Sequence, residues 1–141
     1  MSDYDRDVLT WSERQAALLR RVAAGERVND QVDWGNVVEE IETVGRSEVS
    51  AVESLLTMAL LHDLKSAAWP LSRDVPHRRA EARLFRRQAR RKFTESMRQK
   101  LDLVGLYSDA LAGLPDTMDG QPALPMPSTC PVTLDELLSD D

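Results

Sequence analysis

The sequence is poor in the residues that most often build metal centres and covalent active sites. Its 141 residues include one cysteine, Cys130, and two histidines, His62 and His77. A single cysteine excludes a disulfide within the chain and, with two histidines, leaves little for a thiolate zinc site. The chain also has no glycine-rich phosphate loop and no dinucleotide fingerprint. We therefore expect no metal and no cofactor, and we assign no catalytic residue.

Long apolar runs and strand-forming runs are missing as well. The longest apolar-rich run, LLTMALL at residues 55–61, is far shorter than the roughly 20 residues that span a bilayer. The N-terminal MSDYDRD is polar and acidic, unlike a signal peptide. Runs of β-branched and aromatic residues are absent, while Ala, Leu, Arg and Glu dominate. These features predict an all-α cytoplasmic protein without a membrane contact.

The charges are present in number but separated along the chain. Residues 1–65 carry 7 basic and 13 acidic side chains, residues 73–100 carry 11 basic and 3 acidic ones, and residues 101–141 carry 8 acidic side chains and no Lys or Arg. The net charge of −6 therefore does not reveal that acidic and basic residues are separated along the chain. A basic segment between two acidic ones indicates an interaction surface or an internal charge pairing.

Apolar residues at helical spacing predict a single-domain helical bundle. The expected helices cover residues 5–24, 34–67 and 73–93, followed by one that ends near Ala112. Residues 34–67 form either one long helix or two helices with a break at Gly45, because a glycine costs a helix only about 1 kcal/mol. The bundle is predicted to occupy residues 1–114.

The remaining residues, 115–141, are predicted to form a proline-rich acidic tail on the same domain. Five of the seven prolines lie between residues 115 and 131, so this segment is expected to be extended and loosely packed. It ends in TLDELL, where Thr133 and Glu136 match a capping box for one short helix.

The acidic stretch EEIETVGRSE, which begins at Glu39, is a candidate functional cluster. Glu39 and Glu42 fall away from the apolar stripe, and Arg46 stands four residues after Glu42, which indicates a solvated ion-paired face. Glu48 falls inside the stripe if the helix is continuous, and a buried carboxylate needs a partner. If the helix breaks, Ser47 and Glu48 belong to a helix cap instead.

Two residues further along extend this candidate cluster. His62 leans toward the apolar side of the helix, and Lys65 follows it by three residues. Glu48 and His62 are about 21 Å apart on one helix, too far to share an ion. The residues Arg46, Ser47, Glu48, His62 and Lys65 are therefore assigned as a structural ion-pair group or a functional cluster, with a core histidine as the simpler interpretation of His62.

The arginines of the basic helix are the other candidate. The following residues share one broad face opposite Phe85 and Ala89: Arg79, Arg83, Arg86, Arg87, Arg90 and Arg91. Such a face can bind anions or track a phosphate backbone. No aromatic residue is interleaved for base stacking, so internal pairing and an acidic protein partner are favoured over nucleic acid.

Four sequence blocks resemble one known family. They are YDRDVLTW (residues 4–11), DWGNVVEEIETVGRSE (33–48), LLHDLK (60–65) and CPVTLDELL (130–138). In this order they resemble the bacterial domain-of-unknown-function family twenty-nine over nearly the whole chain. Asp63 and the SAAW that follows Lys65 depart from the family pattern. The resemblance implies an all-helical fold and no particular activity.

Three functions remain open from the sequence. The preferred one is a non-enzymatic interaction or accessory protein that binds an unknown protein partner or forms a homo-oligomer. The first alternative is a nucleic-acid-associated regulator that uses the basic helix at residues 73–100. The second is a metal- or acid-dependent enzyme centred on Glu48 and His62.

Overall fold

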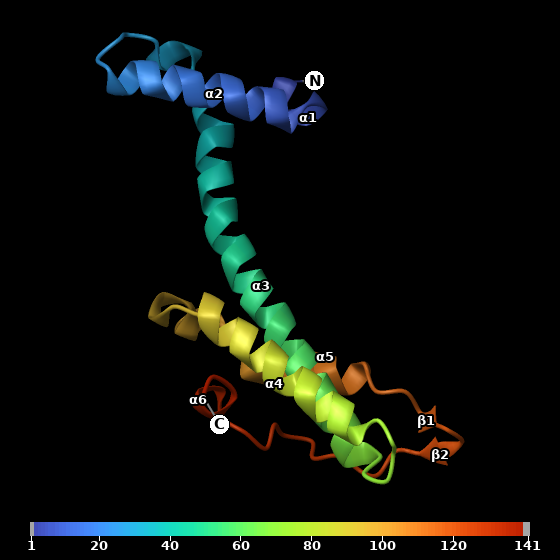
Figure 1. Cartoon of the computed structure of the whole chain (residues 1–141). Coiled ribbons are helices and arrows are strands. Elements are labelled where there is room, and N and C mark those ends of the chain that lie inside the picture. Colours follow the sequence, from blue (N-terminus) through green and yellow to red (C-terminus); the bar gives the residue numbers. More distant parts are fainter. Residues whose placement is uncertain (1, 140–141) are drawn as a thin grey trace. The chain divides into compact units, whose positions relative to one another are not determined.

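The computed structural model describes residues 2–139 and confirms the predicted all-α fold (Figure 1). The elements are α1 (Asp3–Arg6), α2 (Val8–Ala23), the 3-10 helix η1 (Asn29–Gln31), α3 (Trp34–Ala68), α4 (Val75–Lys92), the 3-10 helix η2 (Glu95–Lys100), α5 (Leu103–Ala112), the short strands β1 (Thr117–Met118) and β2 (Gln121–Pro122), and α6 (Leu134–Leu137).

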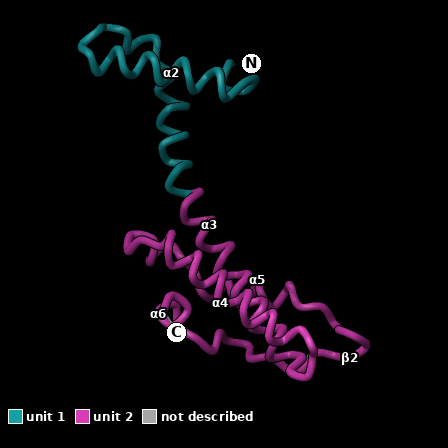
Figure 2. Tube along the Cα trace, in the orientation of Figure 1, with its two compact units in different colours: residues 1–46 teal, residues 47–141 magenta. Residues whose placement is uncertain are grey.

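The chain forms two compact units that meet within α3. The first comprises Met1–Arg46 and the second Ser47–Asp141 (Figure 2). The second unit thus contains the tail that begins at residue 115. The domain boundary that the sequence suggests after residue 114 stays a prediction.

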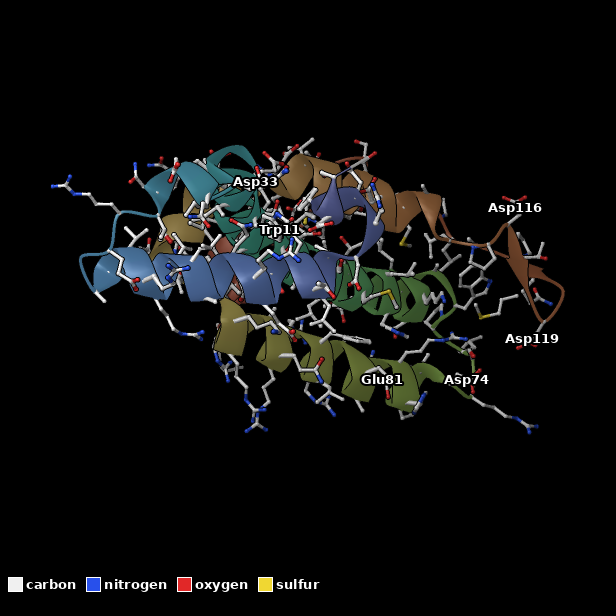
Figure 3. The ribbon with its side chains drawn as sticks, turned by 90° about the horizontal axis from the view of Figure 1, so that it is seen from above. Trp11, Asp33, Asp74, Glu81, Asp116 and Asp119 are labelled. Atoms are coloured by element: carbon white, nitrogen blue, oxygen red, sulfur yellow. The ribbon has the colours of Figure 1, made fainter. Side chains whose placement is uncertain are left out.

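The first unit has a small core around Trp11. Its buried apolar residues are Trp11, Leu18, Val28, Val32 and Val37. The helix expected from residue 5 to 24 is divided at Asp7, whose carboxylate accepts a hydrogen bond from the backbone N–H of Thr10 (3.1 Å) and so caps α2. The Trp11 indole N–H donates to Asp33 Oδ2 (2.9 Å), which joins α2 to the start of α3 (Figure 3).

Helix α3 continues through Gly45 without a break. A Cβ added at Gly45 would meet no other atom within 4 Å, so this side of the helix is open. The two-helix alternative is therefore wrong. The penalty of one glycine, about 1 kcal/mol, is too small to end a helix that is well formed on both sides.

The second unit is built around the later part of α3. Its largest fully buried side chains are Val52, Leu56 and Leu137. Ala89 of α4 and Met97 of η2 pack into the same core, as do Leu106, Tyr107 and Ala110 of α5. Helix α4 begins after Asp74, with Pro76 in its first turn as predicted.

The tail is more ordered than the sequence suggests. The Tyr107 hydroxyl donates to the Pro127 carbonyl (2.6 Å), and the Leu124 N–H donates to the Ala68 carbonyl (3.1 Å). Leu137 is only 1% exposed. Apolar side chains between the prolines reach the core of the second unit, so the tail packs on this unit more closely than expected. These partly buried residues are Met126, Cys130, Val132, Leu134 and Leu138.

A two-residue hairpin turn interrupts the tail. Strands β1 and β2 pair antiparallel, with Thr117 opposite Pro122 and Met118 opposite Gln121. The turn residues Asp119 and Gly120 have φ values of 52° and 76°. An Asp-Gly pair with both φ values positive is the preferred two-residue hairpin connection. The sequence therefore held a signal for this hairpin that our prediction missed.

Candidate functional site

The acidic stretch of α3 is a solvated helix face. Arg46 pairs with Glu39 (2.8 Å) and with Glu42 (3.6 Å), and all three side chains are more than half exposed. Ser47 and Glu48 are exposed too, although the helix is continuous. The expectation that a continuous helix would bury Glu48 was wrong, since Glu48 is exposed while the next residue, Val49, is partly buried against the core.

His62 and Lys65 lie elsewhere on α3 and do not meet Glu48. The His62 ring stacks on Phe85 of α4, with ring centroids 5.5 Å apart and an interplanar angle of 15°. Its Nδ1 is buried and finds no hydrogen-bond partner among residues 2–139. Lys65 is half-buried. The five residues assigned to one cluster thus form two separate groups, and His62 acts as a packing residue between α3 and α4.

The protonation of His62 makes a testable contribution to stability. Burial, with a smaller effect of Lys65, lowers the pKa of His62 below its ordinary value of 6.5. The unfolded chain then binds a proton at a pH at which the folded chain does not. The free energy of folding that the lowered pKa of His62 provides is fully present above about pH 6.5. It is lost as the pH falls below that value. We expect His62→Gln to reduce the drop in melting temperature between neutral and mildly acidic pH. The comparison variant His77→Gln, at an exposed position of α4, should change that drop much less.

Helix α4 has two different faces. Ala82 and Ala89 are fully buried, and Phe85 is half-buried against α3. The two acids associated with this helix, Asp74 and Glu81, lie near its N-terminal end (Figure 3). The remaining positions are dominated by arginine, so the outward face and the C-terminal end of α4 carry positive charge.

Four of the six candidate arginines line one cavity of about 480 Å³. We call this the arginine cavity, and its lining residues are Ala80, Arg83, Leu84, Arg86, Arg87, Arg90 and Ser139. The two other candidates, Arg79 and Arg91, are exposed on α4 outside this lining. Spacings of three and four residues place Arg83, Arg86, Arg87 and Arg90 on neighbouring turns of one helix side.

Two of these arginines are held by the fold. Arg86 Nη1 pairs with Asp63 Oδ2 of α3 (3.1 Å), and Arg90 Nη1 donates to the Ser139 carbonyl (2.9 Å). Burial raises the pKa of Asp63, and the charge of Arg86 opposes this rise. Arg83 and Arg87 are exposed and make no hydrogen bond or ion pair with the part of the chain that the structure describes. The cavity therefore combines two oriented guanidinium groups with two that can turn toward an anion.

An apolar residue lies among these arginines. Leu84 is 47% exposed and lines the same cavity. The sequence reasoning did not single it out, although its place between Arg83 and Arg86 was a usable signal. The arginine cavity can therefore hold carboxylates or phosphates together with an apolar group.

A second cavity, of about 530 Å³, lies between the α3–α4 turn and the hairpin. Trp69, Leu71, Met118 and Leu124 contribute apolar surface to it. The Trp69 indole N–H donates to the Gln121 carbonyl (2.9 Å), which holds the hairpin against the turn. This cavity can take an apolar group, but none of the candidate arginines lines it.

Residues 2–139 contain neither a cluster of metal-ligating side chains nor a membrane-spanning helix. Within them, no group of three or more His, Cys, Asp and Glu side chains is arranged to hold a metal ion. Over the same residues, no helix has the length and hydropathy of a membrane span.

Comparison with known proteins decides the family. The model of the family described as Domain of unknown function DUF29 matches residues 4–141, which is nearly the whole chain. The chain belongs to the DUF29 family. The resemblance predicted from the four sequence blocks is thus confirmed. No curated protein matches this DUF29 chain.

One solved structure resembles this DUF29 chain. It is an alpha-helical protein of unknown function from Rhodospirillum rubrum, 22% identical, with a TM-score of 0.68. The match covers 100% of this chain and 92% of that one. At this identity the likeness supports the fold alone.

Proposed function

We propose that this DUF29 protein is a non-enzymatic interaction protein whose arginine cavity binds an acidic segment of a protein partner. The observation that carries the proposal is the set of four arginines around the exposed Leu84 in one cavity. Guanidinium groups form paired hydrogen bonds with carboxylates, and an exposed leucine adds an apolar anchor point. An acidic helix with apolar residues supplies both kinds of group.

The placement of the aromatic residues favours protein over nucleic acid. Phe85 is stacked on His62, and the Phe93 ring is covered by the Arg98 guanidinium, whose Cζ lies 5.5 Å from the ring centroid. Neither ring is available as a platform for bases, and binding of single strands relies on such stacking. A phosphate backbone also gives Leu84 no apolar partner.

The protein's own C-terminal segment offers an internal example of this recognition. Arg98 pairs with Asp135 of α6 (2.8 Å), Arg90 holds the Ser139 carbonyl, and Leu137 is buried in the core. A leucine-containing acidic segment is thus held by Arg98 of η2 and Arg90 of α4. We infer that the arginine cavity uses the same combination of charge and apolar contact for its partner.

A binding titration tests this proposal. The probe is a fluorescently labelled, acidic helical peptide with one leucine per turn. Replacing both Arg83 and Arg87 with alanine should weaken its binding by about tenfold or more, because a tenfold change is about 1.4 kcal/mol and hydrogen bonds to charged groups contribute about 1.5–3 kcal/mol each. Binding should also weaken as salt is added.

Matched controls separate this site from a general charge effect. Replacing Arg20 and Arg27, two exposed arginines of the first unit, removes the same charge and should leave the affinity nearly unchanged. A peptide with Gln in place of each Glu should bind poorly. Equal effects of the two double substitutions, or tighter binding of a DNA oligonucleotide than of the acidic peptide, would contradict the proposal.

A further inference from the structure

The first unit exposes more large apolar side chains than it buries. Its core contains five buried apolar residues. Six large apolar side chains of the same unit are exposed: Val8, Leu9, Trp34, Val38, Ile41 and Val44. Small domains bury a low fraction of their surface, and contiguous apolar patches mark interaction sites. This unit therefore presents surface that a partner can cover.

Four of these six residues form one stripe on α3. Trp34, Val38, Ile41 and Val44 follow each other at spacings of four, three and three residues, and they are 46% to 67% exposed. Residues at this spacing share one side of a helix. Gly45 lies beside the stripe with open space around it, which allows close approach of another helix. We call this surface the α3 stripe.

The charges beside the stripe are acidic. With about 100° of rotation per residue, Glu48 falls in line with Ile41, and Glu42 falls on the stripe's edge. Glu48 is exposed and makes no ion pair with residues 2–139, while Glu42 is more than half exposed and pairs with Arg46 at 3.6 Å, farther than Glu39 does at 2.8 Å. Pairing of two such stripes would bring glutamates together, which is unfavourable. The stripe therefore fits a basic helix that also carries an apolar residue.

The same chain contains such a surface. The arginine cavity offers Arg83 and Arg87 for carboxylates and the exposed Leu84 for an apolar contact. We infer that the arginine cavity of one copy binds the α3 stripe of a second copy. This inference rests on the proposed function, and it names the acidic partner segment as residues 34–48 of another molecule of this protein.

Charge reversal combined with mixing tests the inference. We expect the wild-type protein to self-associate with increasing concentration in sedimentation velocity. The variants Arg83→Glu/Arg87→Glu and Glu42→Lys/Glu48→Lys should each remain monomeric, because each brings like charges together. All four side chains are exposed, so circular dichroism should show an unchanged helix content. An equimolar mixture of the two variants should associate again, because each copy then meets an oppositely charged surface.

The control variant Glu13→Lys/Asp30→Lys changes the net charge equally at exposed positions outside the stripe, and it should associate like the wild type. A wild-type protein that stays monomeric over the whole concentration range, or a mixture that does not associate, would overturn the inference. The proposed function is tested apart from it by adding the acidic peptide to Glu42→Lys/Glu48→Lys, whose arginine cavity is intact. Peptide binding by this variant, together with a wild-type protein that stays monomeric, would remove the second copy as partner and leave the proposed function standing.

Discussion

Replacing Trp11 with alanine is expected to lower the free energy of unfolding of the first unit by about 3–5 kcal/mol, the cost of removing a large aromatic side chain from a core. Trp11 is 5% exposed and is one of the five buried apolar residues in that unit. Its ring packs edge-on against Tyr4, with centroids 4.8 Å apart, and its N–H satisfies Asp33. The other four buried apolar side chains of this core are leucine and valine, which are smaller than the indole.

Hydrogen exchange measures this effect along the chain. Amides of residues 8–33 should lose protection in Trp11→Ala, while those of the later part of α3 and of α4 should keep it, since they belong to the second unit. Trp34→Ala is the matched control, because Trp34 is about half exposed and its removal should cost much less. Equal loss of protection throughout residues 2–139 would mean that the two units unfold as one.

Replacing Leu137 with alanine is expected to destabilise the second unit by about 2–5 kcal/mol. Leu137 is 1% exposed and packs in one core with Val52 and Leu56 of α3. Leu137, from a short C-terminal helix, is thus buried in this core as fully as residues of the central helix α3. Chemical denaturation of the purified protein measures the change.

Leu124→Ala provides the comparison for this prediction. Leu124 lies in the same tail and undergoes the same chemical change, but it is 51% exposed. Surface substitutions of this kind usually change stability by no more than about 0.5 kcal/mol. Equal losses in the free energy of unfolding for Leu124→Ala and Leu137→Ala would contradict this prediction and support the loosely packed tail that the sequence suggested.

The helices could be predicted because their signals are local. The apolar spacing in α2, α3 and α4 is visible within a few turns, and Asp74 with Pro76 marks the start of α4. Thr133 also caps α6 as predicted, accepting a hydrogen bond from the Glu136 N–H (3.1 Å). In each case the residues that set the boundary stand within four positions of it.

The packing of the tail could not be predicted from such signals. The Trp69 N–H donates to Gln121, 52 residues away, and Arg90 contacts Ser139, 49 residues away. A proline-rich composition indicates an extended backbone, but it does not tell whether the side chains between the prolines find a core. The hairpin is a different case, since the Asp119-Gly120 signal was local and was overlooked.

The contacts of the candidate site could likewise not be predicted from the sequence pattern. Charge counting located the arginines, but periodicity could not tell which of them the fold would hold. Asp63 orients Arg86, and the C-terminal segment contacts Arg90. Glu48 was misplaced for a related reason: its helical phase lies near the edge of the buried stripe of later turns, and the side chain is exposed whereas the next residue, Val49, packs against the core. The helical periodicity predicts which side of the helix a residue faces. It does not predict whether another element packs against that side.

The central claim is that the arginine cavity is the binding surface of this protein. The most direct measurement is an NMR titration of isotope-labelled Glu42→Lys/Glu48→Lys with the acidic helical peptide, since this variant is expected to be monomeric. We predict saturable chemical-shift changes concentrated on the residues that line the cavity, which are Ala80, Arg83, Leu84, Arg86, Arg87, Arg90 and Ser139. Changes confined to the second cavity around Trp69, or no saturable change at all, would contradict the account.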